Sequence, residues 1–527
     1  MTPTFDVAVV GAGSAGCAAA ARLSEDPNCR VVLLEAGGDG RRDPRITVPA
    51  FAVSLHGSKR DWGFRTEAQP SLDGRRLRWP RGRTLGGSSA LNYLTFLRGD
   101  PACYDGWANA GCAGWAYRDV LPVFKRLEDH DLGPSEHHGR GGPVRVSAQQ
   151  GWANPLTEAF LDAAEQVGLA NIEDLDNPGK GGAGRYFVTV RDGQRASAAT
   201  AYLANAQLRP NLEIRTGVLA QRLLTDGEFV RGVEISAKRR VERIYADAVI
   251  LCAGAIGSPT LLLRSGIGPA DEIRRLGIDP VFDAPQVGAN LADHLLAPVV
   301  YAGPRGLTLP EAALRPAAAI AYMRERGGPW GSLGSCGVIC RSQPDAALPD
   351  LQITFALASL VNDGHTRPQR AFTLAAVGLQ PASRGHLRLR DANPATPPVI
   401  EPSYLSDERD FKPMLHGIRL ARQIANAPAL ARWSRGEREP GSEQNSDAEL
   451  KQWLGHRAQS SYHPVGTCRM GGDADAVVDP QLRLQGVEGL WVADASVMPT
   501  IVSANTNAAC LMIGERAADF VRAARRP

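Results

Sequence analysis

The sequence predicts an α/β fold that is α+β over the whole chain. One domain has a parallel sheet flanked by helices, and a second domain is built on an antiparallel sheet with helices. Three observations predict this. Residues 5–35 read as a strand, a glycine-rich turn, a helix and a second strand. The apolar stretch over 246–268 reads as a further strand that leads into a helix. Residues 386–425 alternate, then break at prolines and then turn helical, which indicates a strand and a helix outside the parallel sheet.

The first strand and its turn predict a phosphate-binding loop. Phe5–Val10 is apolar and rich in β-branched residues, as a strand buried in a parallel sheet requires. Gly11 permits the tight turn that follows, Gly13 lets the backbone approach a pyrophosphate, and Gly16 lets the next helix pack close to the strand. We expect the helix over 14–24 to present its free N–H groups to the phosphates.

The second strand, Arg30–Leu34, leads to an acidic side chain. Glu35 follows Gly16 by 19 residues, a spacing at which a carboxylate can accept hydrogen bonds from the hydroxyls of a ribose. Together the turn, the helix and the acidic tip predict a Rossmann-like, dinucleotide-binding unit. A glycine-rich turn in a plain α/β domain is the alternative. NAD and FAD share this fingerprint, so the choice between them depends on the rest of the chain.

Further motifs lie along the rest of the chain. Within residues 80–99, the GGSS motif places two glycines and two serines in a loop whose backbone can touch a flat ring, although the same residues suit an ordinary helix-capping loop. The strand and helix over 246–268 can line a dinucleotide crevice at the carboxyl edge of the sheet. The other motifs are VGANLADH (287–294), YHPVGTCRMG (462–471) and VVDPQLRLQGVEGLWVADASVMP (477–499).

Together these motifs resemble the glucose–methanol–choline (GMC) family of flavin oxidoreductases, over nearly the whole chain and least over about 300–380. The resemblance implies FAD rather than NAD as the cofactor. Some members of the family tether the flavin through a histidine just before the Asn of the GGSS motif. That position is Leu91 here, so we expect non-covalent FAD. The resemblance also implies oxidation of a primary alcohol to the aldehyde, after which O₂, a quinone or another carrier reoxidises the flavin.

The resemblance assigns the cofactor contacts residue by residue. It places Ser14, Ala15 and Glu35 at the adenosine half of FAD, and Asp494 and Ala495 at the ribityl and pyrophosphate side. Besides the three glycines of the first turn, the other expected FAD contacts are Ala36, Thr84, Gly87, Ser88, Asn92, Tyr93, Leu94, Thr95, Ala220 and Thr506.

Two residues near the C-terminus are expected to be catalytic. His463 precedes Pro464, which restrains the chain just after it, and an imidazole with a near-neutral pKa can take the proton of an alcohol as a hydride leaves. The resemblance makes Asn505 its partner, and an amide can hold the substrate oxygen. Asn507 is the nearby alternative, expected instead to cap a helix over 508–522.

The expected substrate is an aromatic or heteroaromatic alcohol, such as a pyridoxine-like or hydroxymethylfurfural-like molecule. The first hundred residues are most similar to the pyridoxine oxidases of the family, although Ser461 and Tyr462 stand where those enzymes carry further histidines. Choline would require an aromatic cage or a carboxylate, and no cluster of aromatic residues marks the motifs near His463. Choline or an aliphatic alcohol is the alternative substrate. The rival classes are an NAD-dependent dehydrogenase and a flavin-binding protein without turnover.

Composition and cysteine spacing exclude several other classes. The net charge of +3 is too small, and the basic residues too scattered, to indicate nucleic acid binding. No long apolar run predicts an integral membrane segment, and no signal-peptide pattern precedes Phe5, so we expect a cytoplasmic protein. The nine cysteines are scattered and odd in number, which argues against a disulfide framework and a metal cluster. Cys336 and Cys340 could share a helix face, but two thiols make only half a zinc site.

The distances between the dinucleotide motifs require a discontinuous domain. We expect the FAD-binding domain over 1–155, 190–300 and 456–527, and the substrate domain over 156–189 and 301–455. The glycine-rich turn near the N-terminus and the His–Asn pair near the C-terminus must then meet in space. The sequence does not indicate the oligomeric state.

Overall fold

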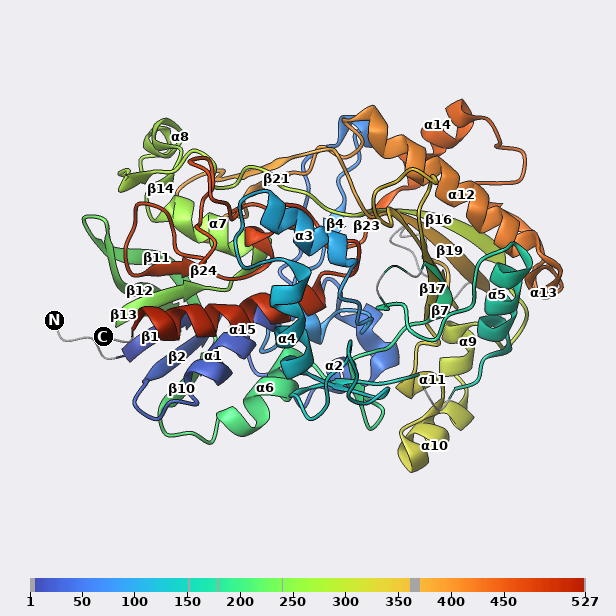
Figure 1. The fold of residues 1–527 in the computed structure, drawn as a ribbon, viewed down its shortest axis with the longest axis horizontal. Helices are drawn as coiled ribbons and strands as arrows, with labels where there is room; N and C mark the ends of the chain where they lie inside the picture. The colour runs from blue at the N-terminus through green and yellow to red at the C-terminus, as the bar shows by residue number, and fades with distance from the viewer. Residues whose placement is uncertain are drawn as a thin grey trace.

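The computed structural model describes residues 5–149, 152–177, 179, 181–238, 240–360 and 370–525, and builds them around two seven-stranded sheets (Figure 1). The order of the first sheet is β10-β2-β1-β13-β12-β11, and β24 also pairs with β13. Its strands are β1 (Phe5–Val10), β2 (Val31–Glu35), β10 (Leu212–Thr216), β11 (Val218–Asp226), β12 (Phe229–Ala237), β13 (Arg240–Leu251) and β24 (Leu490–Val492).

One end of this sheet is parallel, as predicted. β1 lies between β2 and β13 and is parallel to both. Its side chains over Val7–Val10 are buried, as expected for a strand inside a parallel sheet that has no solvated face. The other end is an antiparallel arm, in which the first half of β13 pairs with β12. The second half of β13 pairs with β1 and carries the chain to the glycine-rich turn.

The elements around this turn lie close to their predicted bounds. Helix α1 (Ser14–Leu23) begins at the predicted residue, and β2 ends on Glu35 itself. The predicted strand and helix over 246–268 are the end of β13 and α7 (Gly254–Arg264). Both βα turns use glycines at positive φ, Gly11 at 102° and Gly254 at 81°, a backbone conformation that residues with a Cβ rarely adopt.

The second sheet is antiparallel, and helices pack on it as the sequence predicts. Its order is β22-β16-β19-β18-β17-β7, with β23 also paired to β16. Helix α12 (Phe411–Asn426) packs against β18 and β19 and covers one face of the sheet (Figure 1). The strands are β7 (Gly182–Arg185), β16 (Leu295–Ala302), β17 (Cys336–Cys340), β18 (Leu351–Ala356), β19 (Ala371–Gly378), β22 (Glu437–Glu439) and β23 (Gln459–Ser460).

Two local predictions are wrong. Cys336 and Cys340 lie on strand β17 and not on a helix, since β-sheet pairing on both sides outweighs the weak helical spacing of the two thiols. Within the described ranges no group of three or more His, Cys, Asp or Glu side chains could hold a metal ion. Asn507 is not the cap of the C-terminal helix: α15 (Asn507–Ala524) includes it, and Thr506 occupies the N-cap position. The division into two discontinuous domains stays a prediction.

The two ends of the chain lie side by side. Helix α15 packs along α1 so closely that a Cβ on Gly514 would lie 2.3 Å from the carbonyl oxygen of Ala15. The Arg525 guanidinium forms a 2.9 Å ion pair with Asp6 on β1, and both termini emerge at the same end of the molecule (Figure 1). This packing brings the last motifs of the sequence to the first glycine-rich turn.

The remaining elements are short strands and peripheral helices. The predicted strand at 386 is β20 (His386–Arg388), which pairs with β21 (Val399–Glu401) in a small antiparallel sheet apart from the main one. No helix in the described part of the chain is long and apolar enough to cross a membrane. The other short strands are β3 (Phe64–Arg65), β4 (Arg78–Trp79), β5 (Glu128–His130), β6 (Val144–Val146), β8 (Val190–Arg191), β9 (Gln194–Arg195), β14 (Ile267–Gly268) and β15 (Phe282–Asp283). The other helices are α2 (Pro44–Thr47), α3 (Pro101–Asn109), α4 (Tyr117–Leu127), α5 (Pro155–Gln166), α6 (Ala198–Ala206), α8 (Ala270–Arg275), α9 (Leu309–Ala313), α10 (Pro316–Glu325), α11 (Gly328–Gly331), α13 (Pro428–Ala431) and α14 (Asp447–Arg457), and the 3₁₀ turns are η1 (Pro49–Leu55), η2 (Pro70–Leu72), η3 (Gly87–Ala90), η4 (Glu408–Asp410) and η5 (Ala495–Val497).

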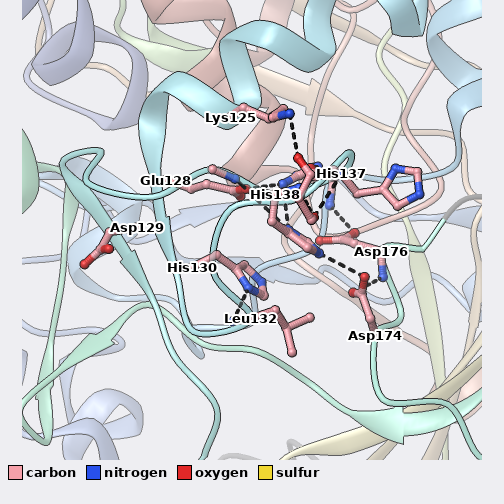
Figure 2. Close-up of polar contacts among 12 residues, drawn as sticks. Lys125, Glu128, Asp129, His130, Leu132, His137, His138, Asp174 and Asp176 are labelled. Carbon is pink, nitrogen blue, oxygen red and sulfur yellow. Dashed lines mark hydrogen bonds and ion pairs between the residues drawn. The ribbon is translucent and has the colours of Figure 1, made fainter.

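A buried ionic network anchors the segment that follows the GGSS motif. His138 bonds Asp174 through Nε2 at 2.9 Å and faces Glu128 with Nδ1 at 3.3 Å (Figure 2). The Arg98 guanidinium pairs with Glu128, and the exposed fraction of each of these two side chains is 1% or less. The His130 ring stacks on His138 at 3.8 Å. These pairs tie the loops after α4 to the chain that leaves the GGSS motif.

The network predicts a loss of stability at alkaline pH. Burial alone lowers the pKa of His138, but the carboxylates of Asp174 and Glu128 outweigh it and raise this pKa from 6.5 to about 9. The folded protein therefore holds a proton that the unfolded chain releases, so the contribution of His138 is complete below pH 6.5 and is lost as the pH rises through about 9. Denaturant unfolding of wild type and His138→Gln at pH 6 and pH 9.5 measures this. The difference in the free energy of unfolding between the two proteins should be smaller at pH 9.5 than at pH 6. An unchanged difference would contradict the role assigned to His138.

Candidate active site

One large cavity lies where the two ends of the chain meet. Its volume is about 620 Å³, within the usual range for small-molecule and cofactor sites. Segments that are far apart in the sequence line it: the turn after β1, the tip of β2, the GGSS loop, the start of α7 and the loops before η5 and α15. These segments carry the sequence motifs other than VGANLADH, none of whose residues lines the cavity.

Two glycines, Gly16 behind the first turn and Gly87 in the cavity wall, are required by close backbone packing. A Cβ on Gly16 would lie 1.9 Å from the carbonyl oxygen of Gly11, and one on Gly87 would lie 2.6 Å from the Cα of Gly13. The GGSS loop therefore sits directly on the first turn. A Cβ on Gly254 would meet nothing within 4 Å and would occupy open space. The result is a bare backbone cradle at the N-termini of α1 and α7, a surface suited to a pyrophosphate.

Two buried carboxylates brace this cradle. Glu35 accepts hydrogen bonds from the backbone N–H of Ala12 at 3.1 Å and of Gly37 at 2.7 Å. Burial raises the pKa of Glu35 to about 7, although these two donors oppose the shift. Asp494 accepts from the Gly254 N–H at 2.8 Å and from the Ser258 hydroxyl at 2.6 Å, which holds the first turn of α7. Each carboxylate retains free lone pairs that a ligand hydroxyl could use.

Most of the residues predicted to bind the cofactor line this cavity. Gly16 and Thr84 do not: Gly16 packs behind the turn, and the Thr84 hydroxyl bonds the carbonyl oxygen of Gly38 at 2.8 Å. The lining residues among those predicted are Gly11, Gly13, Ser14, Ala15, Glu35, Ala36, Gly87, Ser88, Asn92, Tyr93, Leu94, Thr95, Ala220, His463, Asp494, Ala495, Asn505 and Thr506.

The two predicted catalytic side chains face each other across the cavity wall. Asn505 Nδ2 lies 3.2 Å from His463 Nε2. Asn505 Oδ1 is buried and has no hydrogen-bond partner among the residues that the structure describes, so it is available to a ligand donor. Asn507 has a different role, because its Oδ1 accepts a 2.7 Å hydrogen bond from the Ser14 hydroxyl and ties α15 to α1.

His463 is held at its backbone and at its second ring nitrogen. Its N–H donates to Asp293 Oδ1 at 2.6 Å, and its Nδ1 lies 3.0 Å from Nδ1 of His294. Asp293 in turn accepts from the hydroxyls of Ser460 and Tyr404. Burial lowers the pKa of His463 well below its usual value, and the neighbouring His294 and the Arg81 cation lower it further. The imidazole is therefore neutral at physiological pH, so one of its ring nitrogens is unprotonated and can accept a proton.

Aromatic rings from separate segments gather in the wall of this cavity, although no aromatic cluster marks the sequence motifs near His463. The His56 ring makes edge contacts with Tyr93 at 5.9 Å and with Tyr462 at 5.7 Å between ring centroids. All three line the cavity. Sequence patterns could not reveal this cluster, because His56 directly follows a 3₁₀ turn and Tyr93 lies in a loop, and neither segment has an aromatic periodicity.

Other functional candidates were missed for a similar reason. Asp293 and His294 end the VGANLADH motif, but nothing in one sequence shows that they lie behind His463. Arg81, in the motif before GGSS, donates a 2.5 Å hydrogen bond to the carbonyl oxygen of Tyr462 and also lines the cavity. Tyr404 carries no local signal.

The residues of the cavity fit a flavin dinucleotide. The glycine cradle at two helix N-termini suits the pyrophosphate, and Glu35 lies at the tip of β2 where a ribose would be held. The cavity then runs to His463 and Asn505, where the redox ring of such a cofactor would meet its substrate.

Comparison with known families supports this assignment of the cavity. Residues 5–296 match the N-terminal model, and residues 381–514 the C-terminal model, of GMC oxidoreductase. The chain is 42% identical to mitochondrial choline dehydrogenase of Homo sapiens, over 98% of this chain and 90% of that protein. It is 40% identical to an oxygen-dependent choline dehydrogenase of Burkholderia multivorans, over 100% of this chain and 94% of that protein. Among solved structures, pyridoxine 4-oxidase from Mesorbium loti superposes with a TM-score of 0.90 and 36% identity, over 98% and 99% of the two chains.

Proposed function

The chain belongs to the GMC oxidoreductase family, which uses FAD, and on this premise we propose that it oxidises a primary alcohol on an aromatic or heteroaromatic ring to the aldehyde, with His463 as the base. One observation carries the proposal: His463 Nε2 and Asn505 Nδ2, 3.2 Å apart, line the same cavity as the glycine-rich turn. A neutral imidazole and an amide thus lie at the far end of a dinucleotide site.

The roles follow from the chemistry of each group. FAD, when bound, supplies the ring that accepts the hydride from the alcohol carbon at flavin N5. His463 Nε2 takes the hydroxyl proton, which raises the electron density on the oxygen and favours loss of the hydride. The Asn505 amide holds the substrate oxygen in line with the imidazole. We propose that O₂, or a quinone or other carrier, takes the electrons in the second half of the cycle.

The ring preference rests on the aromatic cluster. His56, Tyr93 and Tyr462 form an aromatic wall of the cavity that His463 also lines, and such walls favour flat substrates through edge and stacking contacts. The acidic residues that line the cavity are Glu35 and Asp494, and both already accept backbone hydrogen bonds at the dinucleotide end. The similarity to pyridoxine 4-oxidase agrees with a CH₂OH carried on a ring.

Choline is the second candidate, and two observations favour it. The chain is 42% identical to a choline dehydrogenase. The same aromatic cluster could also receive a quaternary ammonium group through cation–π contacts. Arg81 opposes this candidate, because its cation lines the same cavity.

An anaerobic flavin-bleaching screen tests the substrate class. Enzyme is mixed without oxygen with choline, an aliphatic alcohol, benzyl-type alcohols, hydroxymethylfurfural and pyridoxine, and the bleaching rate of the flavin is recorded. We expect a ring alcohol to reduce the flavin fastest. If choline or a long-chain aliphatic alcohol is faster than every ring alcohol, the substrate proposal is wrong. If no alcohol bleaches a bound flavin, the proposed reaction is wrong.

The form of the cofactor is a separate prediction. Leu91, the position at which some family members carry a flavin-tethering histidine, is a buried aliphatic residue that cannot form such a bond. Acid precipitation of the purified holoprotein should therefore release all the yellow colour into the supernatant. Flavin that stays with the pellet would contradict non-covalent binding.

A further inference from the structure

His294 contacts the catalytic histidine through an unusual pair of atoms. The two Nδ1 atoms of His294 and His463 lie 3.0 Å apart, and the rings are nearly perpendicular, at 89°. At this distance one nitrogen must donate a hydrogen bond and the other must accept it. Two unprotonated (bare) nitrogens would repel each other, and so would two N–H groups. The question is which histidine carries the proton.

A backbone carbonyl decides the direction. Nε2 of His294 lies 3.0 Å from the carbonyl oxygen of Leu379. A carbonyl oxygen only accepts, so Nε2 of His294 must carry a proton. His294 is fully buried, and burial lowers its pKa to about 4, so the ring is neutral and has one proton only. Its Nδ1 is therefore bare and accepts.

The same logic then sets the proton on His463. Since Nδ1 of His294 accepts, Nδ1 of His463 donates to it. His463 is neutral as well, so its single ring proton is on Nδ1 and its Nε2 is bare. That bare nitrogen faces Nδ2 of Asn505, which is a donor, at 3.2 Å. Each donor in the hydrogen-bonded chain from Asn505 through the two histidines to the Leu379 carbonyl then faces an acceptor.

We propose that His294 is a positioning residue that holds His463 in the tautomer with a bare Nε2, so that the lone pair that takes the alcohol proton always points into the cavity. This rests on the proposed function of His463. With the opposite tautomer, His463 would present an N–H to the substrate and a bare Nδ1 to the bare Nδ1 of His294. A histidine free in solution exchanges between both tautomers, so the partner decides which one the substrate meets.

The charged groups around His294 and His463 do not set the tautomer of His463. Asp293 lies next to His294 in the chain, but its oxygens accept from the backbone N–H of His463 and from the hydroxyls of Ser460 and Tyr404 rather than from either ring. The Arg81 guanidinium donates to the carbonyl oxygen of Tyr462. Neither group bonds a ring nitrogen of His463, so the tautomer depends on His294 and Asn505.

Nuclear magnetic resonance of the ring nitrogens reads the tautomer without any turnover. The holoprotein labelled with ¹⁵N-histidine gives well-separated signals for protonated and bare ring nitrogens, and His463→Ala and His294→Leu identify the two rings. We expect His463 to be protonated on Nδ1 and bare on Nε2, and His294 to show the reverse. A wild-type His463 protonated on Nε2 would overturn the proposal.

A graded set of variants tests the consequence for the reaction. Asn at position 294 places an acceptor oxygen near the original Nδ1, Gln places its polar atoms near Nε2 instead, and Leu provides neither. We expect His294→Leu and His294→Gln to slow flavin reduction on the order of 10²-fold, at the low end of what a positioned base contributes, and His294→Asn to recover most of the rate. The expected loss is in the reduction rate at saturating substrate, not in KM. His416→Leu, which removes a partly exposed imidazole from α12, is the matched control.

The outcomes separate this proposal from the proposed function. If all three substitutions at 294 slow reduction equally while FAD content and unfolding are unchanged, His294 only fills space and the proposal is wrong. A pH profile of reduction that is the same in His294→Leu as in wild type leads to the same conclusion. Failure of the wild type to oxidise any alcohol would refute the proposed function, whereas the resonance experiment would still report the tautomer of His463.

Discussion

We expect His463→Ala to retain FAD and to lose reduction of the flavin by the alcohol by about 10²–10⁴-fold, the range that a positioned acid–base group contributes. The reason is local. His463 contributes the ring nitrogen that faces Asn505, and the expected cofactor contacts lie on other segments of the cavity. Anaerobic stopped-flow reduction measures the step directly, because reoxidation cannot mask it.

Controls keep this result specific to the imidazole. The flavin absorbance of the variant should match that of wild type, which shows that the cavity is intact. His416→Ala removes a histidine from α12 and should reduce at the wild-type rate. Reduction of His463→Ala within about threefold of wild type, far below the range for a general base, would remove His463 from the mechanism.

The second large effect is expected at the other end of the cavity. Glu35→Ala should weaken FAD binding by about 10–100-fold, since hydrogen bonds to a charged group contribute about 1.5–3 kcal/mol. The variant loses the carboxylate that braces the Ala12 and Gly37 N–H groups and that we expect to hold the ribose. The measurement is the FAD content after purification and a titration of the apoprotein with FAD.

Glu35→Gln separates shape from charge at this position. It keeps one carbonyl oxygen that can accept from either backbone N–H, so it should bind FAD better than Glu35→Ala and more weakly than wild type. Once saturated with FAD, both variants should be reduced at close to the wild-type rate. Full FAD occupancy together with slow reduction would place Glu35 in the chemistry and not in cofactor binding.

The sequence was informative where function depends on local backbone geometry. Gly11, Gly13 and Gly16 predict the first turn, because few other residue types fit a tight βα turn under a phosphate. The structure places β1, α1 and the tip of β2 within about one residue of their predicted bounds. Two other local predictions were wrong: the helix face shared by Cys336 and Cys340, and the capping role of Asn507. The spacing of Cys336 and Cys340 fits a helix and also a strand, so only pairing with β7 and β18 could decide.

The proposed catalytic site depends even more on contacts that local sequence patterns do not predict. His463 and Asn505 were identified by resemblance to a family, and the tertiary structure placed them 3.2 Å apart. The partners of His463 come from distant segments: His294 lies 169 positions away in the chain. Nothing in the local pattern of either segment encodes that contact.

The sequence by itself therefore determined the dinucleotide turn, because short-range geometry and residue type are sufficient for it, and its motifs indicated the family and, by resemblance, the proposed catalytic pair. Only the tertiary structure decided the aromatic wall of His56, Tyr93 and Tyr462 and the contact between His294 and His463. The physical reason is that such contacts depend on how two sheets and their loops pack against each other. That packing is a property of the whole buried core, whereas each local pattern is compatible with several arrangements.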